Sequence, residues 1–487
     1  MGDHYIVQTF GCQMNEHDSE RISGLLEESG LQRTSELDEA NVIVLNTCCI
    51  RENADNKFYG HLGNLKQLKE QNPDLKILVG GCLAQKDQDQ IRERAKHVDV
   101  VFGTHNLNRV VDLLDLSKKN GPIVEIVEPF EIESDSSSYG VLPVRRELEY
   151  AAWMTIQSGC DNSCAFCIVP QVRGPEVSRP FEDLVQEASR IVSDGVIEIT
   201  LLGQNVNSYG RDITTRLRSQ EEGPKDQILA GPHWPDQGRR RARPLFANLL
   251  QEIGSIPGIS RVRFTSPHPK DFKREVIDVM AKTPAVCEHL HLPLQSGSDR
   301  ILASMHRGYN VSKYLERIHE ARRIIPDLAV TTDIIVGFPG ETEKDFEETL
   351  AVAAEVEYDS AYTFVFSPRP GTEASEMTAD FCNPDIVSER YERLRTVVLR
   401  SGLRKHQERV GRNEEIIVEG PSKKNASVMT GRTRQNKLIH FESEKKIPIG
   451  SVAVAQVVEA SSRYLRGELV EVLETPKRKM RIPVVAV

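Results

Sequence analysis

Three cysteines stand within eight positions in the stretch SGCDNSCAFCIVP, residues 158–170. Cys160, Cys164 and Cys167 follow a short apolar run that favours a β-strand, so we expect them on a loop at a strand end. A structural zinc site has four ligands, and no nearby His or Cys stands at a conventional spacing to complete one. Cysteine thiolates also hold iron–sulfur clusters, and a cubane bound by three of them keeps one iron available. The spacing therefore favours an open iron–sulfur cluster.

A second cysteine set follows three expected strands near the start of the chain. Cys12 comes after YIVQTF, Cys48 after NVIVLN and Cys82 after KILVGG, and a helical stretch follows each run. Repeated strand and helix units predict a parallel α/β layer, and ligands bind at the carboxyl edge of such sheets. A single buried cysteine is a common core residue, so only the placement on three successive turns suggests a shared site.

The rest of the sequence predicts two further architectures. Six strand-and-turn units, mostly followed by helices, begin near residues 153, 197, 261, 289, 330 and 361 and predict an incomplete α/β barrel. Short β-type runs near the end predict a small all-β barrel. The expected division is an α/β domain at 1–117, a linker at 118–148, a six-stranded partial barrel at 149–385 with an inserted loop at 211–243, a basic helical connector at 386–412, an all-β domain at 413–475 and a basic tail at 476–487.

The composition narrows the class of protein. The chain has 487 residues, of which 39% are hydrophobic and 28% charged, as in soluble globular proteins. Neither a signal peptide nor a run of roughly 20 apolar residues occurs, so a cytoplasmic location is expected. Nine cysteines are too few for a disulfide scaffold of this length. The net charge of −10 disfavours a protein whose whole surface is basic and binds nucleic acid. It permits local basic grooves, and the candidate segments are 238–243, 393–412, 431–438 and 475–481.

The loop with Phe166 directly before its last cysteine resembles the signature of the radical S-adenosylmethionine (SAM) superfamily. This resemblance implies that the open iron binds SAM and that the reduced cluster cleaves it to a 5′-deoxyadenosyl radical. It also implies SAM contacts at other strand ends, at Gln204 and Asn205 in LLGQNVNSYG and at Asp333 and Gly337 in DIIVGFPGETE. A stabilising cluster and ordinary turn residues are the alternatives.

The chain further resembles the methylthiotransferase family in GCQMNEHDSE, NTCCIRENA, VGGCLAQ, HLPLQSGSDRIL and SPRPGTEA. The likeness covers nearly the whole chain except the linker and the inserted loop. It implies a second 4Fe-4S cluster on Cys12, Cys48 and Cys82, beside the one on Cys160, Cys164 and Cys167, and a carboxy-terminal RNA-binding TRAM domain. Cys49 adjoins Cys48, but neighbouring side chains of an extended strand point opposite ways, so Cys48 is the expected ligand unless a turn intervenes. Cys287 and Cys382 are expected to be structural.

The resemblance is greatest to members that add a methylthio group to carbon 2 of N(6)-dimethylallyladenosine next to the tRNA anticodon. It implies that one SAM methylates sulfur on the auxiliary cluster and a second supplies the radical. The implied partners are a tRNA anticodon loop and a one-electron donor such as flavodoxin or ferredoxin, with no membrane and a monomeric state. Relatives that modify threonylcarbamoyladenosine or a ribosomal-protein aspartate are alternatives. A non-catalytic iron–sulfur protein for RNA binding or electron transfer is the alternative from another class.

Overall fold

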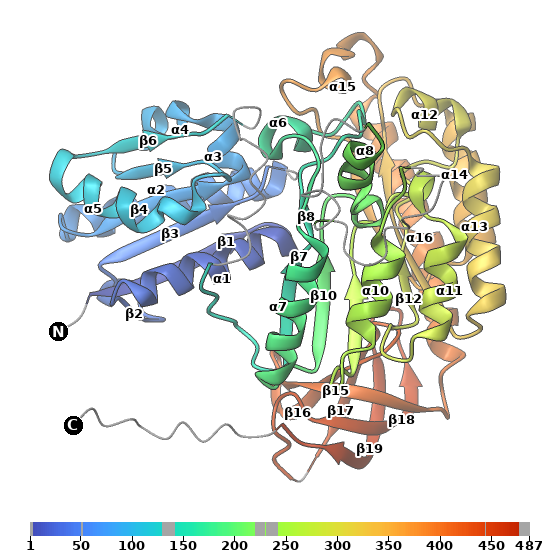
Figure 1. Cartoon of the computed structure of the whole chain (residues 1–487). Helices are drawn as coiled ribbons and strands as arrows, with labels where there is room; N and C mark the ends of the chain where they lie inside the picture. Colours follow the sequence, from blue (N-terminus) through green and yellow to red (C-terminus); the bar gives the residue numbers. More distant parts are fainter. Residues whose placement is uncertain are drawn as a thin grey trace.

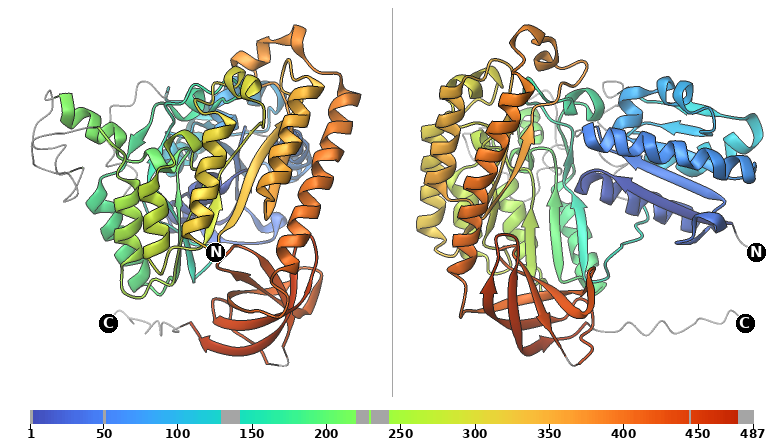
Figure 2. Two further views of the ribbon diagram at one scale, coloured as in Figure 1. Left: turned by 90° about the vertical axis from the view of Figure 1, so that its right-hand side faces the viewer. Right: turned by 180° about the vertical axis from the view of Figure 1, so that it is seen from behind.

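The computed structural model describes residues 3–49, 52–128, 142–219, 229, 242–443 and 445–476. An amino-terminal α/β layer lies beside a larger α/β barrel, and a small β-barrel lies beneath the latter (Figures 1 and 2). Most of the expected insertion after residue 219, part of the expected linker and the tail from 477 lie outside the described residues. No helix in the described ranges is long and apolar enough to cross a membrane.

The amino-terminal sheet has six parallel strands in the order β2-β1-β3-β4-β5-β6. They are β1 (His4–Phe10), β2 (Gln32–Arg33), β3 (Val42–Thr47), β4 (Lys76–Gly81), β5 (Val100–Phe102) and β6 (Ile123–Glu125). Side chains alternate between its faces: Ile43 and Leu45 enter one hydrophobic core, and Val42 and Val44 enter the other. β6 lies in the range expected to be linker, since three residues are too few to show a periodic pattern.

Helices cover both faces of this sheet. Residues of α1 (Gln13–Glu28) and α5 (Val110–Asn120) fill one core, while residues of α2 (Glu52–Gln71), α3 (Cys82–Asp87) and α4 (Asp89–Arg94) fill the other. The helical stretch expected after KILVGG forms two short helices, because Gln88 has a φ of 46° and interrupts the helical backbone.

Six strands form the expected partial barrel. They are β7 (Ala151–Thr155), β10 (Glu198–Leu202), β11 (Arg261–Phe264), β12 (His289–His291), β13 (Ala329–Val336) and β14 (Ser360–Val365). Two three-stranded parallel sheets, β7-β10-β11 and β12-β13-β14, meet at a bridge between Val262 and Val286. No pairing joins β7 to β14 within the described part of the chain, so the barrel is open between these two strands.

The outer helices complete the barrel. They are α7 (Phe181–Ser193), α8 (Arg211–Ser219), α10 (Phe246–Gly254), α11 (Arg274–Lys282), α12 (Asp299–Ser304), α13 (Val311–Ile324), α14 (Glu343–Val356), α15 (Glu373–Glu376) and α16 (Pro384–Gln407). α8 begins the expected surface loop, yet Ile213 and Leu217, four residues apart, are buried in the barrel core. The expected connector is mostly α16, whose Leu394 and Val398 join the same core, so it acts as a barrel helix.

The carboxy-terminal domain is a closed barrel of five strands in the order β15-β16-β17-β19-β18. They are β15 (Asn413–Ser422), β16 (Asn425–Thr433), β17 (Leu438–Glu442), β18 (Val452–Ala460) and β19 (Leu465–Glu474). It docks where the strands of the large barrel begin: Arg261 Nη1 donates to the Arg432 carbonyl at 2.7 Å, and Arg263 Nη1 to that of Arg434 at 2.9 Å. Arg261 is completely buried, so this junction is part of the folded core.

Candidate functional site

Cys12, Cys48 and Cys82 follow the carboxyl ends of three adjacent strands, β1, β3 and β4. β1 and β3 also flank the point where the strand order reverses, which is the usual ligand position in open parallel sheets. A hydrogen bond links the thiols of Cys12 and Cys48. Gly11 permits this approach, because a Cβ at that position would lie 2.6 Å from the Cys48 Cβ. The structure thus gathers this cysteine set, called the auxiliary triad below, at one sheet edge.

Polar side chains surround the auxiliary triad. Arg173 Nε donates to Cys82 Sγ at 3.3 Å, and Cys12 Sγ donates to Asn15 Oδ1 at 3.3 Å. The hydrogen bond with Cys48 lowers the pKa of Cys12 to about 6, although burial opposes the shift. A bond with Cys49 lowers the pKa of Cys82 to about 7, and the Arg173 charge acts in the same direction on both thiols. Cys12 and Cys82 therefore lose their protons more readily than ordinary thiols.

Cys49 is closer to this site than the sequence predicted. It is completely buried in a hydrophobic core, and its thiol hydrogen-bonds to Cys82, while Cys48 faces Cys12. The chain bends at Cys49 directly after β3, so the alternation of an extended strand does not separate the two neighbours. The two neighbours therefore have different partners: Cys48 bonds to the partly exposed Cys12, and Cys49 bonds to Cys82 within the hydrophobic core.

The second set, Cys160, Cys164 and Cys167, lies on the loop after β8 (Gln157–Ser158) and is called the loop triad. The Cys160 amide donates to the Gly174 carbonyl at 3.1 Å, which closes the loop. Gly159 has a φ of 77°, and a Cβ there would lie 1.9 Å from the Pro175 carbonyl oxygen, so only glycine fits.

The charge environment of the loop triad differs from that of the auxiliary triad. Burial raises the pKa of Cys160 to about 11 and that of Cys167 to about 12. Arg307 donates from Nη1 to Cys164 Sγ at 3.2 Å. These thiols must lose protons when they bind metal, because the thiolate is the ligand.

Both triads border one cavity of about 1340 Å³. Cys12 lines it from the auxiliary domain and Cys167 from the loop triad. The cavity follows the inside of the large barrel down to Arg432 and Asn436 of the small β-barrel. A ligand in this space can therefore meet groups from both cysteine sets.

The residues expected to contact SAM divide into two groups. Phe166 and Asp333 line the cavity, whereas Gln204, Asn205 and Gly337 are not among its lining residues. Asn205 Nδ2 donates to Asp271 Oδ2 at 2.9 Å, which gives this side chain a structural bond. A Cβ at Gly337 would lie 2.6 Å from Val387, so this glycine is explained by the close packing of α16.

The residues present fit iron–sulfur clusters and a polar cofactor. No three His, Cys, Asp or Glu side chains in the described ranges converge on a single ion. A 4Fe-4S cluster binds each thiolate at a different iron, so thiols gathered around an edge suit it better than thiols meeting at a point. Gln204 Oε1 and Asn205 Oδ1 are also buried without a hydrogen-bond partner, which is unusual for native proteins and suits a polar ligand nearby.

Sequence reasoning missed the two arginines that donate to the triads. Arg173 follows the loop triad in the stretch IVPQVRGPEVSR, residues 168–179, and Arg307 follows α12. Their thiol partners lie 91 and 143 positions away in the chain, so spacing carried no signal of either contact. The only available hint was a basic residue soon after the last cysteine of the loop.

Comparison with known proteins agrees with this architecture. Residues 4–103 match the Uncharacterized protein family UPF0004, residues 154–353 the Radical SAM superfamily and residues 407–470 the TRAM domain. The chain is 47% identical to a Mycolicibacterium smegmatis protein named tRNA-2-methylthio-N(6)-dimethylallyladenosine synthase, over 95% of this chain and 86% of that protein. A protein of the same name from Tropheryma whipplei is also 47% identical, over 95% of this chain and 92% of that protein. The chain belongs to the tRNA-2-methylthio-N(6)-dimethylallyladenosine synthase family. A third member, from Acidothermus cellulolyticus, is 48% identical over 95% of this chain and 87% of its own.

The family assignment confirms the methylthiotransferase resemblance and the predicted radical SAM barrel and TRAM domain. The fold is also similar to a solved radical S-adenosylmethionine methyltransferase, TsrM from Kitasatospora setae, with cobalamin and a [4Fe-4S] cluster bound. That likeness has a TM-score of 0.50 and 13% identity, and it covers 77% of each chain. At this identity it supports the fold alone.

Proposed function

We propose that this protein adds a methylthio group to carbon 2 of N(6)-dimethylallyladenosine in tRNA, the reaction that the names of its relatives describe. The observation that carries the proposal is the single cavity bordered by both cysteine triads. A radical centre and a sulfur-bearing centre must act on the same carbon atom, so they need one shared space. Two separate sites would not serve this reaction.

In this proposal the loop triad holds the cluster that binds SAM, and the auxiliary triad holds a second 4Fe-4S cluster. When bound, these clusters and SAM supply the electron, the radical and the sulfur. The role of the chain is to hold the thiolates, fix the distance between the centres and exclude water. Gly11 and Gly159 permit the close backbone approaches that each triad needs.

The cavity offers suitable groups for an adenine base. Trp153 and Tyr362 give it aromatic surface, and Tyr362 keeps 58% of its area exposed. His291 and Asp333 lie 3.4 Å apart and line the same space, so they can present polar atoms to a base edge. RNA-modifying enzymes generally read splayed bases through stacking and such edge contacts. We assign these four residues to binding and orienting the adenine, so that Asp333 serves the substrate base in place of the SAM contact expected from the sequence.

The RNA partner would be held by the small β-barrel. Two of the basic segments expected to contact phosphate, 393–412 and 431–438, are largely neutralised by internal ion pairs: Arg409 pairs with Glu414 at 2.7 Å, and Arg434 with Glu288 at 2.8 Å. Exposed lysines occur instead beside the strand ends of this barrel, at Lys423, Lys424, Lys445 and Lys446. We propose these lysines as phosphate contacts for the anticodon arm, because unpaired surface cations supply most RNA affinity.

The remaining partners are proposed on chemical grounds. Reduction of a cluster needs a one-electron donor such as flavodoxin or ferredoxin. We further propose a monomer that works in the cytoplasm, where its tRNA substrate is found.

The test uses protein reconstituted with iron and sulfide, reduced, and mixed with SAM and purified tRNA. We expect 5′-deoxyadenosine and, on tRNA bearing N(6)-dimethylallyladenosine, a mass gain of one methylthio group. tRNA bearing threonylcarbamoyladenosine and the small-subunit ribosomal protein are the controls, and neither should gain mass. Cluster-loaded protein that makes no 5′-deoxyadenosine would overturn the enzymatic proposal, and modification of a control substrate would overturn the substrate assignment.

A further inference from the structure

Arg173 connects the two cysteine triads through one buried side chain. It is the last residue of α6 (Val169–Arg173), the helix that begins two residues after Cys167. Its Nε donates to Cys82 Sγ at 3.3 Å, and its Nη2 pairs with Asp18 Oδ2 of α1 at 2.7 Å. Only 6% of the residue is exposed. An arginine from the segment of the loop triad thus binds a thiol and a carboxylate of the auxiliary domain.

The backbone beside Arg173 makes the complementary contacts. The Gly174 carbonyl accepts the Cys160 amide at 3.1 Å, and the Val172 carbonyl accepts Thr104 Oγ1 of the auxiliary domain at 2.8 Å. Three consecutive residues therefore contact the loop triad, the auxiliary triad and the auxiliary domain. A shift of this stretch would move both cysteine sets.

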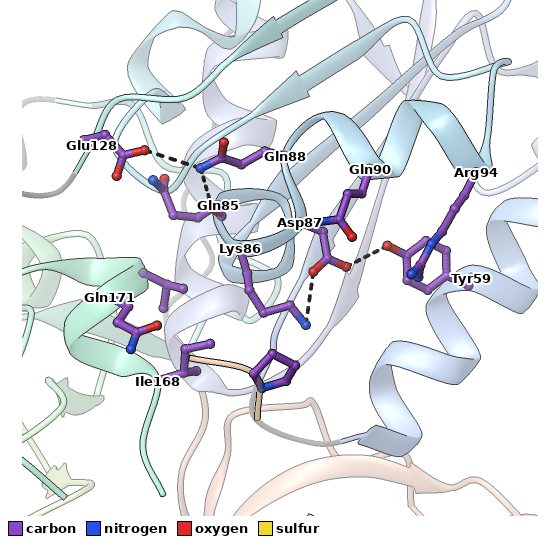
Figure 3. A pocket seen from close by; sticks show the side chains of 12 residues that line it. Tyr59, Gln85, Lys86, Asp87, Gln88, Gln90, Arg94, Glu128, Ile168 and Gln171 are labelled. Atoms are coloured by element: carbon purple, nitrogen blue, oxygen red, sulfur yellow. Dashed lines mark hydrogen bonds and ion pairs between the residues drawn. The ribbon is translucent and has the colours of Figure 1, made fainter. Parts of the chain in front are cut away.

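Helix α6 is fixed in the core of the auxiliary domain. Ile168 and Val172 are 3% and 2% exposed, and both join the hydrophobic cluster that contains Leu83. Figure 3 shows Ile168 and Gln171 facing Lys86 across a cavity of about 520 Å³. Lys86 belongs to α3, whose first residue is Cys82. The two helices that carry Arg173 and Cys82 are therefore packed as one unit.

Hydrogen bonds to cysteine sulfurs are a recognised control on iron–sulfur reduction potentials. A donor with a positive charge stabilises the more negative, reduced cluster and so raises the potential. Arginine can donate from two edges of its planar group, here to a sulfur and to Asp18, whereas lysine offers a single flexible ammonium. The two contacts of Arg173, with Cys82 and with Asp18, use both edges of the guanidinium group.

We propose that Arg173 is a positioning residue, which hydrogen-bonds the Cys82 sulfur of the auxiliary cluster, raises the reduction potential of that cluster and fixes it relative to the loop triad. This inference rests on the proposed function for the presence of a cluster at the auxiliary triad. It adds a residue that does not line the large cavity and acts through Cys82.

The test measures the auxiliary cluster alone. The Cys160→Ala, Cys164→Ala, Cys167→Ala variant leaves only the auxiliary triad, and Arg173→Gln and Arg173→Lys are added to it. In a redox titration followed by electron paramagnetic resonance, Arg173→Gln should lower the reduced-to-oxidised ratio at a fixed potential about tenfold. That change corresponds to about 59 mV for a one-electron couple. Arg173→Lys should restore part of the loss, because it keeps the charge but not both donor edges.

Arg307→Gln is the matched control in the same background. Arg307 is also buried and also donates to a cysteine sulfur, but to Cys164, so the auxiliary potential should not change. If Arg173→Gln fails to bind iron, Asp18→Asn provides the test, because it leaves the Arg173 charge uncompensated without altering Cys82, and a smaller shift in the opposite direction, to a higher potential, is expected. Loaded Arg173 or Asp18 variants with the parent potential would overturn the inference. Absence of any cluster in the parent background would instead overturn the auxiliary site of the proposed function.

Discussion

The two cysteine triads differ in how they bring three thiols together and in how the surroundings shift the pKa values of those thiols. The loop triad gathers three thiols within eight positions, and burial raises the pKa of Cys167 to about 12. The auxiliary triad gathers its thiols from three strands, and hydrogen bonds between thiols lower the pKa of Cys12 to about 6. Burial dominates the pKa of the loop thiols Cys160 and Cys167, whereas hydrogen-bond donors dominate that of Cys12 and Cys82 in the auxiliary triad. Each triad offers three cysteine ligands, but the two triads hold them in different charge environments.

The largest expected difference between the triads concerns their roles. Cys160→Ala should abolish 5′-deoxyadenosine formation, because the SAM-binding cluster loses a ligand. Cys12→Ala should keep SAM cleavage but yield no methylthio product, because only the auxiliary cluster is affected. Iron analysis should find about half of the parent content in either variant if each loses one of two clusters. Product analysis by mass spectrometry distinguishes the two outcomes.

Cys287→Ala is the control for both substitutions. Cys287 is buried but lies at the bridge between β11 and β12, away from either triad, so iron content and both products should persist. Methylthio transfer by Cys12→Ala would refute the assigned role of the auxiliary triad. Loss of SAM cleavage in both cysteine variants would show that the triads do not act separately.

The same contrast explains how much of the site could be predicted from the sequence. The loop triad was visible as a local spacing, and the strand-end cysteines indicated a common edge. The strand order was not predictable, because β2 has only two residues, with no pattern to identify it. The contact of Arg173 with Cys82 depends on two domains meeting, and the reason for Gly337 is Val387 on a distant helix. Local chemistry was therefore predicted, and tertiary contacts were not.

Alanine substitutions at Gly159 and Gly11 test how tightly the backbone is packed beside each triad. Gly159→Ala would force a Cβ to 1.9 Å from a backbone oxygen at a φ of 77°, whereas Gly11→Ala meets mainly side-chain atoms. We expect destabilisation of about 2–5 kcal/mol for Gly159→Ala and about 1–3 kcal/mol for Gly11→Ala, from overpacking and, in the first, backbone strain. Denaturant unfolding of the cluster-free proteins measures both. A larger loss for Gly11→Ala than for Gly159→Ala would contradict the conclusion that only glycine fits at position 159 of the loop triad.

Substitution of Arg307 tests the charge environment of the loop triad, as substitution of Arg173 tests that of the auxiliary triad. Its guanidinium donates to Cys164 Sγ and lies over the ring of Tyr309 at 5.5 Å. Arg307→Gln removes that charge, and we expect SAM cleavage to fall about 10- to 100-fold, as is typical for groups that orient metal ligands. Single-turnover assays of 5′-deoxyadenosine measure the effect. An unchanged rate with full iron loading would remove Arg307 from the description of this site.

The smallest expected effect distinguishes the neighbouring cysteines of the auxiliary triad. Cys48→Ala should lose the auxiliary cluster, whereas Cys49→Ala should retain it and lose only about 1 kcal/mol of stability, because Cys49 behaves as a small core residue. The hydrogen bond from Cys49 to Cys82 is absent in that variant, so a modest change in the spectrum of the auxiliary cluster is expected. Iron content and thermal unfolding measured side by side provide the test. The reverse result, iron lost only in Cys49→Ala, would exchange the two assignments and place the cluster on the core side of the sheet edge.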